Sequence, residues 1–223
     1  MANENKPETP FHVVFLGQRI NRYEVPLDIF RVINKIYESS VDTLPSAHQQ
    51  LVGKIKKEHS LYNSLDTPRM KKHNVLPPYI LAWFESIFAH YLNSHQFPIK
   101  EMHLNSIWVN EMEAHEYNPI HVHQGTLLTG LSSVMMLKIP KDMGPEIVRA
   151  DNPNRGNLQL MGNCAGYFTK TDFSPSLEER SFYIFPYDMR HCVYPHTNPN
   201  AVRRTLAANM DVEYNPVATR AAG

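Results

Sequence analysis

The sequence predicts a mainly β fold of the sandwich or barrel type, with α-helical support from the first half of the chain. After Pro98, short runs of β-branched and aromatic residues follow one another, with Gly, Pro and Asn between them. Before Pro98, apolar residues recur at helical spacing instead. Because no repeat or low-complexity linker divides the chain, we expect one domain over residues 1–223. Its mostly helical support would be 1–100 and its β core 101–212.

The first half is predicted to contain one strand and three helices. The strand spans 11–16 and ends at Gly17. The first helix is expected over 26–39, where six apolar residues define one buried face. A second helix would start from a cap at Ser46 and run to about residue 59. A third, from Pro77-Pro78 to about residue 94, is apolar nearly all round, so we expect it to pack against a sheet.

The second half is predicted to be a series of strands. Alternation and β-branched composition support them, and Gly, Pro or Asn separate them. The expected strands are 102–112, 120–124, 130–139, 147–149, 158–161, 167–169, 181–185, 191–194 and 202–212.

The composition excludes several classes of protein. Of the 223 residues, 42% are hydrophobic and 20% charged, which is typical of an ordinary globular protein. The formal net charge of zero does not favour nucleic-acid binding. No apolar run approaches the roughly 18 residues of a membrane span, and the polar N-terminus lacks a secretory signal. Cys164 and Cys192 form no disulfide framework, so we expect a cytoplasmic protein.

Three histidines have the spacing of a metal site built on strands. His121 and His123 are two positions apart, so both can face the interior if this segment is extended. His191 lies far away in sequence, just after the apolar run that ends at Phe185-Pro186. Two close ligands and one remote ligand can be brought together by separate strands. Imidazole suits Zn, Fe, Cu and Ni, so the spacing does not name the metal.

Arg204 is the candidate for binding an anionic co-substrate near that metal. It lies thirteen positions after His191 (204 − 191) and precedes an apolar segment that is expected to be buried. A buried arginine needs an anionic partner, and its planar guanidinium can bind a carboxylate with two hydrogen bonds. Arg203 would face the opposite side of the strand, and we expect it to be exposed.

These residues together resemble the Fe(II)- and 2-oxoglutarate-dependent oxygenases, and most closely a group of them found in marine bacteria and cyanophages. The resemblance covers about residues 100–212. The matching motifs are Trp108-Val-Asn110, Asn118-x-x-His121-x-His123-x-Gly125, Thr129-Gly130, Phe185-Pro186, His191-x-Val193-x-Pro195 and Arg204-x-x-x-x-Asn209.

The resemblance implies a double-stranded β-helix, or jelly roll, and a dioxygenase. Fe(II) would be held by His121, His123 and His191, and the far carboxylate of 2-oxoglutarate by Arg204. Asn110 and Ser133 would add polar lining around the co-substrate. With molecular oxygen, such an enzyme converts 2-oxoglutarate to succinate and carbon dioxide and hydroxylates an unactivated C–H. The substrate would be a prolyl or other amino-acid side chain or another small molecule. If the chain is phage-encoded, the location would be the host cytoplasm.

His123 departs from the pattern of most of this superfamily, which has Asp or Glu at that position. Three arrangements follow from this difference. His123 ligates and gives a three-histidine site, a carboxylate arrives from elsewhere in the chain, or the acid is missing. Neutral imidazole in place of a carboxylate leaves the metal one charge more positive, which changes metal preference and reactivity towards oxygen.

Two other classes of protein fit the same histidines. A zinc enzyme can hold Zn²⁺ with three histidines and an open water position, but Arg204 would then have no evident role. A non-catalytic jelly-roll module used for binding or assembly would make the histidines incidental. Turnover of the co-substrate separates the oxygenase from both alternatives, and the identity of the bound metal separates iron from zinc.

Overall fold

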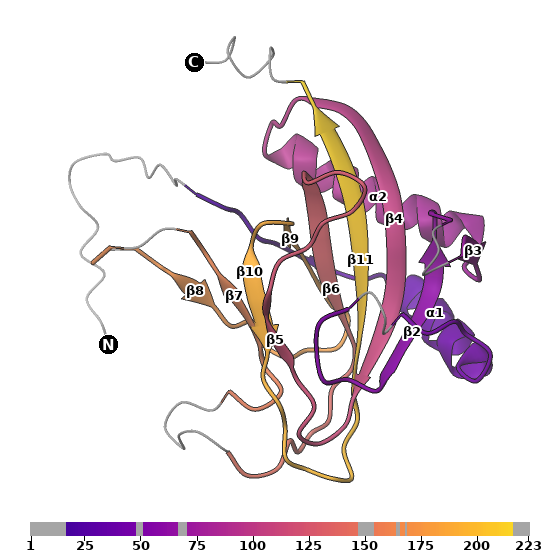
Figure 1. Cartoon of the computed structure of the whole chain (residues 1–223), viewed down its shortest axis with the longest axis vertical. Coiled ribbons are helices and arrows are strands. Elements are labelled where there is room, and N and C mark those ends of the chain that lie inside the picture. Colours follow the sequence, from indigo (N-terminus) through magenta and orange to yellow (C-terminus); the bar gives the residue numbers. More distant parts are fainter. Residues whose placement is uncertain are drawn as a thin grey trace.

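Two antiparallel sheets and two α-helices make up most of the chain in the computed structural model (Figure 1). The structure describes residues 17–47, 51–66, 71–146, 154–163, 166–167 and 169–215. The larger sheet has seven strands in the order β1 (Asn21–Glu24), β9 (Ser181–Pro186), β6 (Gly130–Lys138), β11 (Arg203–Tyr214), β4 (Ile99–Met112), β2 (Lys57–Asn63) and β3 (His73–Asn74). The smaller sheet has the order β5 (Asn118–His121), β10 (Arg190–Val193), β7 (Leu158–Met161) and β8 (Asp172–Phe173).

The helices α1 (Leu27–Ser40) and α2 (Pro78–Ser94) lie on one side of the larger sheet, and the smaller sheet lies on the other (Figure 1). On the helix side, Phe84 and Phe88 of α2 make edge-on ring contacts with Phe182 of β9. These rings belong to a hydrophobic cluster that also contains Ile33 of α1 and Leu206 of β11. Each residue is fully buried or nearly so, which makes this cluster the main core of the fold.

A second hydrophobic cluster fills part of the space between the two sheets. Met112 of β4, Met136 of β6 and Phe185 of β9 meet Leu158 of β7 and Val193 of β10 there. The central strands of the larger sheet are therefore covered on both faces, as their continuous burial shows. The space between the sheets that these side chains leave open holds the candidate site described below.

Most predicted elements are confirmed, with boundaries that shift by a few residues. Two predictions are wrong. The described residues between Ser46 and residue 59 form no helix: Ser46 and His59 form an isolated β-bridge, and β2 begins at Lys57. In β2, Leu61 joins the helix-side core while Ser60 lines the space between the sheets, a two-residue alternation that fits a strand. The strand expected at 167–169 is absent from its described residues, and β8 forms at Asp172–Phe173 instead.

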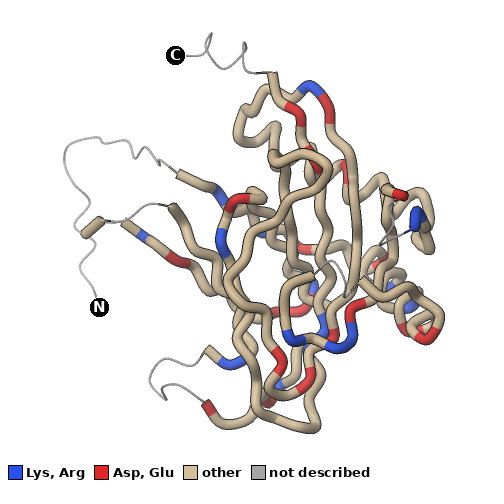
Figure 2. The backbone as a smooth tube through the Cα atoms, in the orientation of Figure 1, with Lys and Arg blue, Asp and Glu red and all other residues tan. Residues whose placement is uncertain are grey.

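The first hundred residues contribute strands as well as helices. β1, β2 and β3 all join the larger sheet, beside strands from the second half of the chain. The strands expected at 11–16 and 147–149 lie outside the described residues. Among the described residues, no helix is long and apolar enough to cross a membrane. Figure 2 shows acidic and basic residues interspersed along the chain, in line with its zero net charge.

Candidate metal centre

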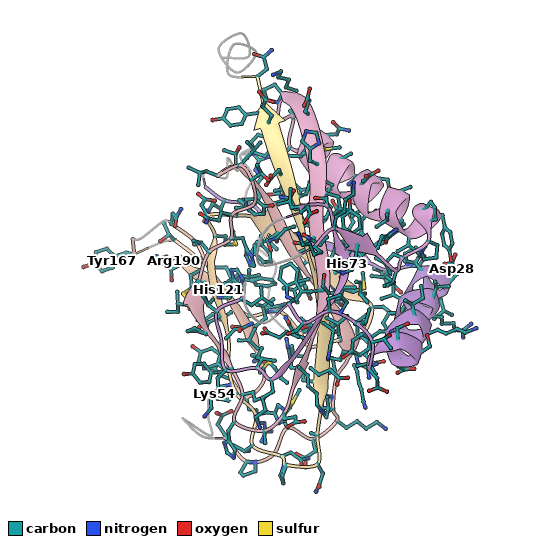
Figure 3. The ribbon with its side chains drawn as sticks, turned by 45° about the vertical axis from the view of Figure 1, so that its right-hand side comes forward. Asp28, Lys54, His73, His121, Tyr167 and Arg190 are labelled. Atoms are coloured by element: carbon teal, nitrogen blue, oxygen red, sulfur yellow. The ribbon has the colours of Figure 1, made fainter. Side chains whose placement is uncertain are left out.

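The pairing of β5 with β10 brings the three histidines together between the sheets. His121 at the end of β5 is the direct partner of His191 in β10. The chain then leaves the strand, and the backbone N–H of His123 donates to the carbonyl of Tyr187 at 2.9 Å. One ring nitrogen from each of the three histidines lies within 4.8 Å of the others. The Nε2 atoms of His123 and His191 are 3.0 Å apart. The position of His121 is labelled in Figure 3.

Burial keeps these imidazoles in the neutral form that binds metals. Desolvation, with a smaller contribution from the nearby His121, lowers the pKa of His191 to about 3. The pKa of His123 is lowered well below its usual value by burial and by its two histidine neighbours. Burial also lowers the pKa of His121, against the opposing effect of its backbone hydrogen bond. Three neutral imidazoles facing one point are a ligand set that Fe(II), Zn and similar cations accept.

Backbone carbonyls orient two of the three rings. Nδ1 of His121 lies 2.7 Å from the carbonyl of Pro119, and Nδ1 of His191 lies 2.9 Å from that of Met189. A carbonyl can only accept, so each Nδ1 carries the proton and donates it. The lone pair of each ring is then on Nε2, which points into the cluster.

No carboxylate joins the histidine group in the described part of the chain. Of the three arrangements expected from the sequence, the geometry fits a group of three histidines, with His123 beside the other two. The predicted polar residues Asn110 and Ser133 line the same cavity, which has a volume of about 640 Å³.

Arg203, not Arg204, lies in this cavity. Its side chain is 1% exposed, and its guanidinium lies between the sulfurs of Met112 and Met136, at 3.7 and 3.8 Å. Its Nε has no hydrogen-bond partner, and no carboxylate pairs with it among the described residues. Burial alone lowers the pKa of Arg203 to about 10. The expectation that Arg203 is exposed is therefore wrong.

Arg204 points to the other face of the sheet, towards α1. It donates to Glu111 and to Glu38, each at 2.8 Å, and its guanidinium lies 4.8 Å from the ring centre of Tyr37. Arg204 therefore does not line the cavity that contains the histidines, which corrects the prediction that it holds an anion beside them. Adjacent residues of a strand face opposite sides, and Arg203 has the inward position.

A buried network that the sequence analysis did not identify anchors the loop after His123. Asp211 of β11 accepts hydrogen bonds from the backbone N–H groups of Thr126 and Leu127, at 2.9 and 3.0 Å. Its other oxygen accepts from the hydroxyl of Tyr187, at 3.2 Å. The same Tyr187 holds His123 through its backbone carbonyl. The network thus joins the loop, the β9–β10 turn and β11.

Gly125 allows this loop to approach the network closely. A Cβ atom at Gly125 would lie 2.0 Å from Asp211 Oδ1 and 2.1 Å from Asn105 Nδ2, so no larger residue fits without a shift. The glycine two positions after His123 was the one signal in the sequence that pointed to this network. Burial raises the pKa of Tyr187, and the negative charge of Asp211 raises it further, so the hydroxyl stays protonated and donates.

Comparison with known proteins supports the interpretation of the three histidines as a metal centre. A family model described as "Putative 2OG-Fe(II) oxygenase" matches residues 106–209, which include all three histidines and both arginines. No curated protein matches the sequence.

Solved structures share the fold. A prolyl-4-hydroxylase from Pseudomonas putida aligns with a TM-score of 0.54 and 10% identity, over 87% of this chain and 92% of that one. AviO1 from Streptomyces viridochromogenes aligns with a TM-score of 0.55 and 10% identity, over 90% of this chain and 91% of that one. A prolyl hydroxylase from Trichoplax adhaerens, in complex with a peptide fragment, aligns with a TM-score of 0.51 and 11% identity. The alignment covers 93% of this chain and 87% of that one.

The chain shares its fold with these solved structures, and its three clustered histidines form a group that could hold a metal ion. Over residues 106–209 the chain resembles the Fe(II)- and 2-oxoglutarate-dependent oxygenases, and this likeness and the three histidines support a dioxygenase that uses Fe(II) and 2-oxoglutarate.

Proposed function

We propose that the protein hydroxylates an unactivated C–H of a peptide-linked amino-acid side chain, with proline as the first candidate. In this proposal His121, His123 and His191 hold Fe(II), and Arg203 binds the far carboxylate of 2-oxoglutarate. The observation that carries it is Arg203, a buried guanidinium without an anionic partner in the described residues, in the same cavity as the three imidazoles. An unpaired buried charge is costly, so such a group is best explained by an anionic ligand.

The donor set fits the metal. Three neutral imidazoles on Fe(II) leave positions open for 2-oxoglutarate and oxygen, as the facial triad of related sites does. When bound, Fe(II) and 2-oxoglutarate supply the oxidising chemistry, in which one oxygen atom enters succinate and the other enters the hydroxylated product. The protein's own residues orient the ligands and exclude water. Ala47, Trp108 and Ala207 form a small apolar cluster, and all three line the cavity.

Two further residues of the cavity differ in what they can offer the co-substrate. The hydroxyl of Ser133 already donates to the carbonyl of Ala208 and accepts from its N–H, at 3.0 and 3.1 Å. Asn110 has a buried Oδ1 without a hydrogen-bond partner, opposite Thr205 of β11. A carboxamide presents a donor or an acceptor according to its rotation. We therefore assign the polar contact with 2-oxoglutarate to Asn110 and a structural role to Ser133.

The charges of the cavity favour a peptide-linked substrate over a free amino acid. Among the described lining residues, Arg203 is the only Lys or Arg, and Glu58 is the only Asp or Glu. If Arg203 binds 2-oxoglutarate, no second cation remains there to pair with a substrate carboxylate. A residue within a peptide has no such carboxylate. Two of the proteins with a similar fold are prolyl hydroxylases, and one was solved with a peptide fragment.

The zinc-enzyme alternative explains less of the cavity. A hydrolytic zinc site with an open water position needs no buried arginine, whereas an anionic co-substrate does. Arg203 therefore favours the oxygenase, and it takes the role that the sequence analysis gave to Arg204.

The first test is anaerobic binding of Fe(II) and 2-oxoglutarate, followed by the weak visible metal-to-ligand charge-transfer band. We expect the band in the wild type, its loss in His191→Ala and a much weaker band in Arg203→Met. Arg204→Met is the matched control, since it removes the neighbouring guanidinium from the opposite face, and its band should be unchanged. A band that depends on Arg204 and not on Arg203 would overturn the assignment of the co-substrate site.

The substrate is tested separately, with proline-containing peptides and free L-proline as a matched pair. Mass spectrometry should detect the gain of one oxygen atom in peptides, coupled to succinate formation and absent without 2-oxoglutarate. Hydroxylation of free proline but of no peptide would contradict the peptide part of the proposal and leave the co-substrate site intact.

A further inference from the structure

Asn209 of β11 is the side chain that meets the outer nitrogen of His123. It lies on the same face of the strand as Arg203, is 7% exposed and lines the cavity. Its Nδ2 is 3.4 Å from Nδ1 of His123, and its Oδ1 is buried without a hydrogen-bond partner. A buried carboxamide oxygen without a partner is rare and needs an explanation.

His123 differs from the other two histidines in what faces its Nδ1. Nδ1 of His121 and of His191 each faces a carbonyl, which fixes the proton on Nδ1. If Nδ1 of His123 accepted from the amide NH₂ of Asn209, the proton of the neutral ring would be on Nε2. That N–H would point at His191 Nε2, 3.0 Å away, and could not ligate a metal.

A half-turn of the Asn209 carboxamide allows the tautomer of His123 that can bind a metal, and Nδ2 then takes the position that Oδ1 had. The rotation exchanges oxygen and nitrogen and leaves the other atoms in place, and the two orientations differ only in hydrogen bonding. With Oδ1 towards His123, the ring donates from Nδ1, the orphaned oxygen gains a partner, and the lone pair of Nε2 faces the other two histidines.

We infer that Asn209 is a positioning residue whose amide oxygen fixes the His123 tautomer that can bind the metal. This inference rests on the three-histidine centre of the proposed function. A carboxylate at position 123 would have no tautomer to fix, so an imidazole there needs a partner of this kind. The other contacts of His123 hold the ring in place without reaching Nδ1. Its backbone N–H donates to Tyr187, and its ring centre lies 6.1 Å from that of Trp108.

The test measures the tautomer and the affinity for a metal, without turnover. Long-range ¹⁵N–¹H NMR of the protein with diamagnetic Zn(II) added reports which nitrogen of each histidine carries the proton. We expect the Nδ1–H form of His123 in the wild type and in Asn209→Asp, which keeps an acceptor of the same size. In Asn209→Leu, which has no acceptor, the population should shift to Nε2–H, while His121 and His191 stay unchanged.

Co(II) titration, followed by calorimetry and by the visible spectrum, is the second readout. Asn209→Leu should lower the affinity about 10- to 100-fold, as the loss of such orienting partners typically does. Asn209→Asp should restore most of it, which a purely structural role of Asn209 would not explain. Circular dichroism checks that each variant is folded.

The variant His123→Ala distinguishes a failure of the three-histidine centre from a failure of the role of Asn209. If His123→Ala binds Co(II) like the wild type, the three-histidine centre is wrong and the role of Asn209 falls with it. If His123→Ala loses affinity but Asn209→Leu does not, the centre stands and only the role of Asn209 is wrong. A wild-type His123 that keeps its proton on Nε2 with Zn(II) bound would also overturn the inference.

Discussion

Arg203 and Arg204 are neighbours in β11, yet their guanidinium groups lie on opposite faces of the larger sheet. Arg203 is enclosed between two methionine sulfurs in the cavity, without an anionic partner among the described residues. Arg204 pairs with two glutamates beneath α1. Among the described residues, carboxylates therefore neutralise Arg204 and leave Arg203 unpaired.

This difference predicts opposite effects of the two arginines on stability. Without co-substrate, Arg203→Met should leave the free energy of unfolding unchanged or raise it, because it removes an unpaired buried charge from an apolar site. Arg204→Met should lower it by about 1–3 kcal/mol, because Glu111 would lose its charged partner while mostly buried. Urea unfolding of the two variants measures both values. Equal destabilisation by both would contradict the assignment of the two faces.

Saturating 2-oxoglutarate, added with a redox-inert metal such as Mn(II), should stabilise the two arginine variants to different extents. A ligand that binds only the folded state raises the melting temperature according to its affinity. The wild type and Arg204→Met should gain stability from 2-oxoglutarate, and Arg203→Met should gain little. The measurement is a thermal melt with and without the co-substrate, and a full gain in Arg203→Met would show that the anion binds elsewhere.

Gly125→Ala should displace the loop that carries His123. The added Cβ would overlap with Asp211 and Asn105, and overpacking of this kind costs about 1–3 kcal/mol. We expect lower stability and weaker metal binding together, measured by thermal melts and Co(II) titration. Gly162→Ala is the matched control, because its Cβ would meet only Thr171 O and Lys170 O, at an ordinary 3.7 and 4.0 Å. Unchanged metal binding in Gly125→Ala would separate the loop anchor from the metal centre.

Tyr187→Phe removes the hydroxyl that donates to Asp211 and keeps the ring and the backbone contact with His123. Asp211 would retain two backbone donors and lose one partner of its buried carboxylate. A hydrogen bond to a charged group contributes about 1.5–3 kcal/mol, so urea unfolding should detect a loss of that order. Metal affinity should change much less than in Gly125→Ala. A larger loss of metal affinity in Tyr187→Phe than in Gly125→Ala would argue against the hydroxyl as the anchor of the loop.

The metal-free protein should lose stability as the pH falls below neutral. The pKa of His191 is about 3 in the folded protein, well below its ordinary value of 6.5, so between these values the unfolded chain binds the extra proton. Stability therefore rises with pH in this window, by up to about 1.4 kcal/mol per pH unit for a single group. His121 and His123 are shifted in the same direction. Unfolding at pH 7 and pH 5 should show a steeper loss for the wild type than for His191→Ala.

The sequence predicted the clustering of the three histidines better than the arginine that lines their cavity. The two-residue spacing of His121 and His123 placed them together, and Phe185-Pro186 placed His191 just beyond a strand end. The structure groups these three residues. For the arginine, alternation could show only that residues 203 and 204 face opposite sides. Both faces of β11 are buried, so no apolar–polar pattern indicates which face lines the cavity.

The network around Asp211 and the segment before β2 lay beyond sequence reasoning for a related reason. Asp211 and Tyr187 are far apart in sequence and meet only because β11 and the β9–β10 turn are brought together. The apolar spacing around Leu51 and Ile55 fits a helix locally, but the chain there pairs with distant segments through isolated bridges at Ser46 and Lys54. Tertiary contacts override a weak local preference in such cases.

The sequence by itself determined the mainly β class, the approximate positions of most elements and the identity of the three clustered histidines, because these depend on local periodicity and spacing. Only the tertiary structure decided that Arg203 is the inward arginine, that Asn209 meets His123 and that Asp211 anchors the loop at Gly125. Each of these depends on which face of a strand packs against which partner. That choice is made by contacts between residues remote in the chain, which local patterns do not encode.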